Sequence, residues 1–187
     1  LNRMGMTTID RPSSDYGLSL VLGGAEASLM DLTSIYANMA KTLNDFSIGR
    51  KSKFIQPTYV KSFINERVND NLLLSPGATW MTFEAMLAVS RPDAEANWQQ
   101  FSSSQKIAWK TGTSFGFRDA WAIGVTPKYA VGIWVGNADG EGRPGIVGVK
   151  AAAPILFDVF KILPKSDWFN QPFDEMKKVP ICKHSGF

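Results

Sequence analysis

The chain has 187 residues, of which 44% are hydrophobic and 20% are charged, and it carries a net charge of +3. This balance is typical of a folded domain with a sizeable core and excludes a disordered chain. The charge is too small and too evenly spread to indicate a nucleic-acid-binding protein. One cysteine, Cys182, and one histidine, His184, exclude an internal disulfide and argue against a metal site, and we expect no cofactor.

The first half of the chain predicts turns followed by helices. Residues 1–24 are rich in Gly and Ser and form no regular element in this prediction. Over 29–43, apolar residues recur every three or four positions, which predicts an amphipathic helix. Ser28 precedes this helix and Asp31 lies three residues later, a pattern that resembles a capping box. A strand is expected over 56–64 and a second helix over 79–90, which Pro92 ends.

The second half predicts a β-meander. Strand-like runs occupy 106–113, 120–125 and 129–135, and the short turn at Pro127 joins the last two as a hairpin. A Gly-rich loop over 136–148 leads into an amphipathic helix over 149–163. Residues 164–187 read as an irregular, mobile tail. The expected fold class is therefore α+β, with an antiparallel β-sheet flanked by helices.

Tryptophans are frequent in this half, and alternating Trp and Ile positions on strands are typical of a core. We therefore expect the following four to be core residues rather than a stacking surface: Trp98, Trp109, Trp121 and Trp134.

The tetrapeptide Lys110, Thr111, Gly112 and Thr113 ends the first of these strands. A lysine supplies a compact cation that attracts a carboxylate. The two threonine hydroxyls lie two residues apart and so project to the same face of a strand. Glycine between them lets a ligand approach the backbone closely. An exposed strand of this kind is suited to pairing with an extended peptide and capturing its carboxyl end.

A wider resemblance supports this interpretation. Lys-Thr-Gly is one of three motifs of the penicillin-binding and serine β-lactamase enzymes. Four stretches extend the motif: 110–124 (KTGTSFGFRDAWAIG), 131–137 (VGIWVGN), 16–26 (YGLSLVLGGAE) and 179–186 (VPICKHSG). With them the chain resembles bifunctional class A penicillin-binding proteins of the 1C type from about residue 5 to residue 163, and 179–186 resembles the junction to the small C-terminal domain of that type.

The resemblance implies a partial penicillin-binding-protein transpeptidase fold, which is β-lactamase-like. Residues 1–163 would be the C-terminal portion of the transpeptidase domain, and 164–187 a tail leading to a small domain that is absent. In this family a serine attacks D-Ala-D-Ala stem peptides, releases D-Ala and passes the acyl group to an amine. By the same resemblance, Lys110, Thr111, Gly112 and Thr113 bind the substrate. The backbone N–H of Thr113 would be an oxyanion donor, and the nucleophile would lie outside this chain.

Two motifs needed for catalysis are missing or unconvincing. The chain contains no Ser-x-Asn, and its one Ser-x-x-Lys, from Ser103 to Lys106, lies too close to Lys110 to fold over as an opposing nucleophile. We therefore expect an inactive fragment of a serine D,D-transpeptidase whose parent also has a glycosyltransferase domain. By resemblance, the parent binds peptidoglycan stems and β-lactams and is anchored on the periplasmic face of the inner membrane.

Truncation should also leave the strand 129–135 with an open edge, which predicts a homodimer. Two alternative functions stay open. One is a D,D-carboxypeptidase or serine β-lactamase relative, and the other is a non-catalytic module that binds peptidoglycan or a partner protein. The sequence upstream of Leu1 would separate these alternatives.

Overall fold

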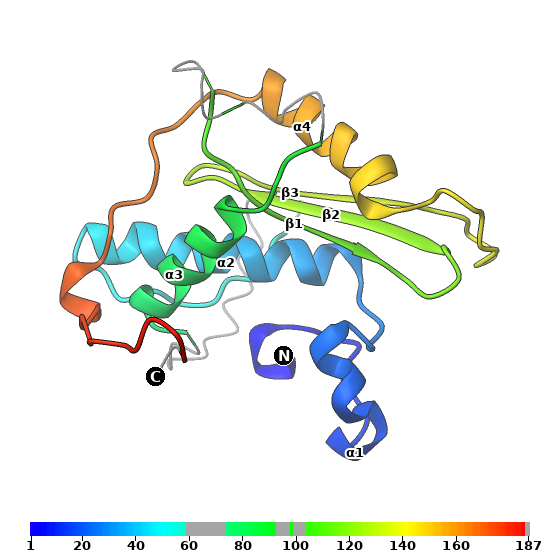
Figure 1. Cartoon of the computed structure of the whole chain (residues 1–187), viewed down its shortest axis with the longest axis horizontal. Coiled ribbons are helices and arrows are strands. Elements are labelled where there is room, and N and C mark those ends of the chain that lie inside the picture. Colours follow the sequence, from blue (N-terminus) through cyan, green and yellow to red (C-terminus); the bar gives the residue numbers. More distant parts are fainter. Residues whose placement is uncertain (59–73, 93–97, 99–103, 186–187) are drawn as a thin grey trace.

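A three-stranded antiparallel sheet forms the centre of the fold. The protein is described by a computed structural model that covers residues 1–58, 74–92, 98 and 104–185. The strands are β1 (Ala108–Thr113), β2 (Asp119–Val125) and β3 (Ala130–Gly136), and their order in the sheet is β1-β2-β3. The predicted meander is therefore confirmed. Within the described residues, β1 and β3 are the two edge strands (Figure 1).

The sheet is built from two hairpins. Thr113 faces Ala120 across the first, and Val125 faces Ala130 across the second. In the second turn, the Thr126 N–H donates to Tyr129 O at 2.8 Å, so Pro127 and Lys128 form a two-residue loop. Proline suits this position because it has no N–H to contribute to a ladder. The predicted hairpin is confirmed.

Helix α2 (Leu29–Ser47) covers one face of the sheet. Ser28 Oγ accepts a hydrogen bond from the Asp31 N–H at 3.0 Å, which confirms the predicted helix start. The Asp31 carboxylate, however, accepts from the Thr7 N–H and hydroxyl, so it does not complete a capping box. The apolar stripe of α2 packs into a buried cluster together with α3 and one face of the sheet; its buried helix members include Ile35, Met39, Ala40, Leu43, Phe83 and Met86.

Helix α3 (Pro76–Leu87) starts earlier than the sequence predicts. Ser75 caps it by accepting from the Ala78 N–H, and Pro76 takes the first helical position, where a missing N–H costs nothing. The helix also ends before Pro92, and the Val89 carbonyl beyond it accepts from Trp109 Nε1 on β1. The segment that follows the helix is therefore held by the hydrogen bond from Trp109 as well as restricted by Pro92.

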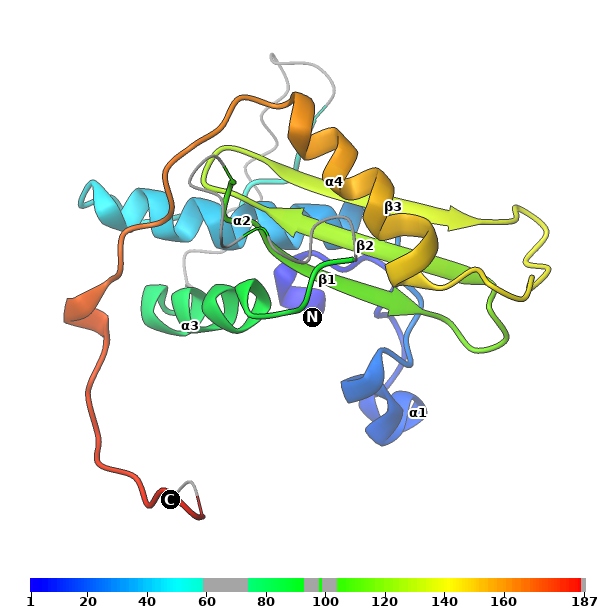
Figure 2. The ribbon, with the colours of Figure 1, turned by 45° about the horizontal axis from the view of Figure 1, so that its top comes forward.

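The opposite face of the sheet is covered by α4 (Ala153–Ile162), as the two views of the ribbon show (Figures 1 and 2). A π-helical turn, η5 (Gly148–Ala152), leads into it, so the predicted helix is divided into two pieces. Trp109 on β1 is 1% exposed and meets the Phe157 ring edge-on at 5.1 Å. The sheet therefore lies between two apolar cores, one against α2 and α3 and one against α4.

The segment after α4 is irregular in its backbone, yet part of it is firmly packed. Phe169 is 7% exposed and its ring lies 5.3 Å from that of Phe83. Trp168 Nε1 donates to the Glu84 carboxylate at 2.8 Å. The expectation of a mobile tail is wrong for this part of the chain. The division of the chain into domains at residue 163 stays a prediction.

Two other expectations concern the remaining segments. Residues 59–64 of the expected strand lie outside the described residues, and 56–58 are not in a strand. Residues 1–24 contain short helical turns that the sequence did not predict: η1 (Asn2–Met4), α1 (Ser13–Tyr16) and η2 (Gly17–Leu22). None of the described helices is long and apolar enough to cross a membrane.

Candidate peptide-binding edge of the sheet

The tetrapeptide Lys110–Thr113 lies in the edge strand β1, as the sequence predicted. Lys110 and Thr113 are exposed, while Thr111 and Gly112 are half-buried. We call the backbone side of Ala108–Thr113 that faces away from β2 the β1 edge. No described strand pairs with it.

Backbone hydrogen bonding determines which groups the β1 edge offers. In an antiparallel pair, residues alternately point both backbone polar groups at the partner strand or away from it. The Ser114 N–H donates to Asp119 O at 3.0 Å, which sets the phase of this alternation. Counting back along the register, Gly112 bonds to Trp121 on β2, while Thr111 and Thr113 direct their N–H and C=O groups outward. These outward groups are what an added peptide strand requires.

Side chains alternate between the faces of the sheet in the same strand. Thr111 and Thr113 project to the face covered by η5, and the Gly148 N–H donates to Thr113 Oγ1 at 2.9 Å. Lys110 projects to the α2 face, yet its ammonium reaches back to donate to Thr111 O, an outward carbonyl, at 2.5 Å. The cation therefore lies beside the β1 edge although its side chain leaves the other face.

Gly112 has room for more than a hydrogen atom. A Cβ placed on it would lie 3.6 Å from Trp121 Cβ, an ordinary contact distance, so nothing described in the chain requires a glycine there. Because Gly112 has no side chain, its backbone is not covered by a side chain of its own on the α2 face of the strand. This feature is consistent with the close approach of a ligand or another segment.

Aromatic side chains lie next to Gly112 on the α2 face. Trp121 on β2 and Trp134 on β3 have ring centroids 6.5 Å apart, and Trp134 Nε1 donates to the Asp119 carboxylate at 2.9 Å. Trp109 is a core residue, as predicted. Trp134 is 37% exposed, so the prediction of a core role is wrong for this residue. The first turns of α2 contact β3 at Gly132. Trp134 lies two residues further along β3 and pairs with Trp121, so both rings lie past the N-terminal end of α2.

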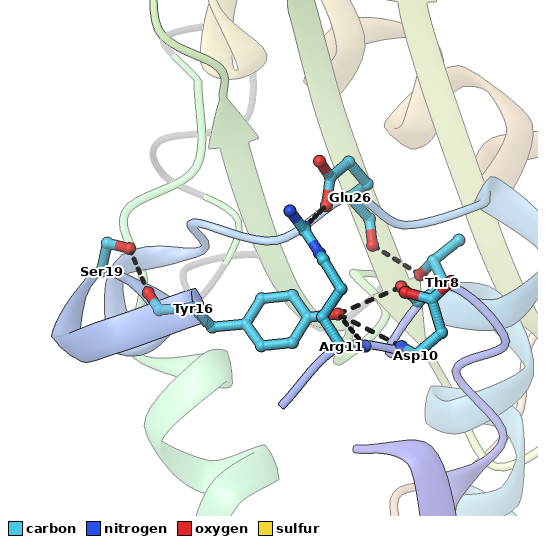
Figure 3. A network of polar contacts seen from close by, with 6 residues as sticks. All are labelled: Thr8, Asp10, Arg11, Tyr16, Ser19 and Glu26. Carbon is cyan, nitrogen blue, oxygen red and sulfur yellow. Dashed lines mark hydrogen bonds and ion pairs between the residues drawn. The ribbon is translucent and has the colours of Figure 1, made fainter. Parts of the chain in front are cut away.

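A polar network fixes the N-terminal segment, and sequence reasoning did not find it (Figure 3). Tyr16 is 4% exposed; its hydroxyl accepts from the Asp10 and Arg11 N–H groups and donates to Thr8 O. The Arg11 guanidinium lies 4.7 Å from the centre of the Tyr16 ring and pairs with Glu26 at 2.7 Å. Hydrogen bonding to Tyr16 and the charge of Glu26 raise the pKa of Arg11.

Next to this network, η2 carries three almost fully exposed apolar side chains: Leu18, Val21 and Leu22.

A metal site or a reactive thiol requires particular side chains and surroundings. Among the described residues, no group of His, Cys, Asp and Glu is placed to hold a metal ion. Cys182 is exposed, and hydrogen bonds from Ser185 and the His184 backbone lower its pKa to about 7. Ser103, the first residue of the one Ser-x-x-Lys spacing, lies outside the described residues.

Comparisons with known proteins bear on the family and the fold of the chain. A scan against models of known families matches none. Penicillin-binding protein 1C of Escherichia coli (strain K12) is 37% identical over 147 residues, which cover 78% of this chain and 17% of that protein. Penicillin-binding protein 1A of Aquifex aeolicus (strain VF5) is 28% identical over 167 residues, 83% of this chain and 21% of that protein. The chain therefore spans less than a quarter of the length of either relative.

A crystal structure of Penicillin-Binding Protein 1A from Haemophilus influenzae matches the fold with a TM-score of 0.58, over 91% of this chain and 31% of that one, at 16% identity. That likeness supports the fold alone. The antiparallel sheet between helical layers and the sequence identity together define the class, and the chain belongs to the penicillin-binding proteins. Within that family it corresponds to part of the transpeptidase region of a class A protein of the 1C type, as the resemblance predicted.

Proposed function

We propose that this chain supplies the substrate-binding strand of a peptidoglycan D,D-transpeptidase. The observation that carries the proposal is the outward-facing backbone of Thr111 and Thr113 in an edge strand that also carries Lys110. A stem peptide ending in D-Ala-D-Ala would extend the sheet at the β1 edge. Its terminal carboxylate would meet the ammonium of Lys110 and the threonine hydroxyls.

The chemistry would proceed by acyl transfer with a serine outside this chain. Attack of that serine oxygen on the penultimate carbonyl forms an ester and releases D-Ala, and an amine from a neighbouring stem then displaces the serine. The N–H of Thr113, which points away from β2, would stabilise the negative charge that develops on the carbonyl oxygen. One such donor is worth about 3–4 kcal/mol of barrier in enzymes that use it.

The proposal treats the isolated chain as inactive. It has no Ser-x-Asn, and its one Ser-x-x-Lys, from Ser103 to Lys106, ends four residues before Lys110, which is too close along the chain for us to expect an opposing nucleophile. Incubation with a fluorescent penicillin, followed by intact-mass measurement, should give no adduct. Covalent labelling at any serine of this chain would overturn this part of the proposal.

Three further properties of the parent protein belong to this proposal. They are a periplasmic location, a membrane anchor and a glycosyltransferase domain outside this chain. The isolated chain should also associate through the backbone of β3 that faces away from β2. The absence of Ser-x-Asn from this chain is the observation that favours the alternative of a non-catalytic binding module. Such a module would bind the same peptides but would have no nucleophile in the adjoining sequence.

The binding step is testable on this chain alone. We would titrate the ¹⁵N-labelled protein with Nα,Nε-diacetyl-Lys-D-Ala-D-Ala and follow backbone amide shifts. Saturable shifts at Thr111 and Thr113 are expected, together with much smaller shifts for the same peptide ending in an amide. Equal responses to the two peptides, or no response at β1, would contradict carboxylate capture at this strand.

A further inference from the structure

Gly148 lies directly against the strand that carries the tetrapeptide. Its N–H donates to Thr113 Oγ1 at 2.9 Å, across 35 residues of chain. A Cβ on Gly148 would lie 2.5 Å from Gly112 O, 2.8 Å from Trp121 O and 3.0 Å from Thr111 Cβ. Real Cβ atoms essentially never come within 3.0 Å of such neighbours, and two of these are backbone oxygens that cannot rotate away. Only a glycine therefore fits at this position without moving β1 or β2.

The reason for the close fit lies in the strand alternation. Gly112 and Trp121 form a hydrogen-bonded pair, and both direct their side-chain positions to the α2 face. On the η5 face this pair therefore exposes bare backbone, and its neighbours on β2 are the small residues Ala120 and Ala122, both fully buried. Gly148 occupies this bare site at the first residue of η5.

We infer that Gly148 is a positioning residue for the proposed substrate-binding strand, acting through Thr113. This inference rests on the proposed function of the β1 edge. Because the Gly148 N–H occupies an acceptor site of Thr113 Oγ1, the hydroxyl proton of Thr113 must point elsewhere. Thr113 is exposed, so that proton is free to donate to a peptide carboxylate. The same contact holds β1 from the face opposite to Lys110.

The inference predicts a non-additive pair of variants. Gly148→Ala and Thr113→Val should each lower the affinity for the carboxylate-ended peptide about tenfold, and the double variant should lower it no further. Thr113→Ser keeps the hydroxyl and should bind nearly as well as the wild type. Additive losses in the double variant would overturn the inference, because independent contributions would then explain the single effects.

Gly145→Ala is the matched control. Gly145 has φ +96° in the same loop, and a Cβ there would meet nothing within 4 Å. Alanine at this position should lower stability through backbone strain, yet leave the preference for the carboxylate-ended over the amide-ended peptide unchanged. If Gly145→Ala abolishes that preference as Gly148→Ala does, general loosening of the loop explains both variants and the inference is wrong.

A second measurement separates this inference from the proposed function and does not need Gly148→Ala to fold. Amide hydrogen exchange at Gly148 is followed without ligand in Thr113→Val and Thr113→Ser. Exchange should accelerate about tenfold in the valine variant and stay near the wild-type rate in the serine variant. Unchanged exchange in the valine variant would contradict the inference. Normal acceleration combined with no peptide binding by the wild type would instead contradict the proposed function.

Discussion

The two edges of the sheet differ in chemistry although their backbones are equally unpaired among the described residues. The β1 edge carries Lys110, Thr111 and Thr113, and the Gly148 N–H donates a hydrogen bond to the Thr113 hydroxyl. The outward residues of β3 are Ala130, Gly132, Trp134 and Gly136, which follow from the Thr126 N–H bonding to Tyr129 O. None of these four is charged.

This difference shows that the side chains of an edge strand, and not its backbone, determine what binds to it. Unpaired N–H and C=O groups attract any extended chain, and side chains decide which one binds. A cation and hydroxyls suit a peptide that ends in a carboxylate, whereas glycines and an exposed tryptophan suit an apolar protein strand. We therefore propose β1 as the ligand edge and β3 as the protein-contact edge.

The largest expected effect contrasts one tryptophan on each edge strand. Trp109→Ala should destabilise the fold by about 3–5 kcal/mol, because the ring is 1% exposed and packs on Phe157. Trp134→Ala, at 37% exposure, should cost less than about 1 kcal/mol. Urea unfolding of the two variants measures both values. Similar losses in the two variants would mean that β1 and β3 are supported alike.

A smaller effect concerns association through β3. Trp134→Lys should weaken self-association of the chain about tenfold, because it replaces an exposed aromatic side chain on the face of that edge strand with a charge, beside which a paired strand would have to lie. Leu18→Lys, which removes an almost fully exposed apolar side chain from η2, should leave association unchanged. Sedimentation equilibrium measures both. A monomeric wild type at high concentration, or a larger effect of Leu18→Lys, would contradict pairing through β3.

The smallest effect on stability is expected at the β1 edge itself. Lys110→Met should change the free energy of unfolding by less than about 0.5 kcal/mol, because the side chain is exposed and its ammonium donates to the carbonyl of the next residue. The same variant should lose most of its preference for the carboxylate-ended peptide. Urea unfolding and the peptide titration check the two halves. A retained preference would exclude Lys110 from carboxylate capture.

Local patterns gave the parts of the fold that depend on neighbouring residues. The apolar stripe of α2, the Ser28 cap and the Pro127 turn are each specified within a few residues, and the structure contains all three. The tetrapeptide at 110–113 lies in a strand, as the strand-like run over 106–113 predicts.

Long-range contacts explain what the sequence did not reveal. Gly148 belonged to a Gly-rich stretch that read as a plain loop, and only the folded sheet shows which backbone it touches. Phe169 lay in a segment without periodicity, yet it completes the core around Phe83. Tyr16 bonds to backbone groups five to eight residues away, and no short motif marked that contact.

Backbone hydrogen exchange along β1 tests the central claim most directly. If the β1 edge is open, the outward amides of Thr111 and Thr113 should exchange about tenfold faster than those of Lys110 and Gly112, which bond to β2. The carboxylate-ended peptide should then slow the outward pair selectively. Equal protection of all four amides in the free protein would show that the edge is already covered and would contradict the account.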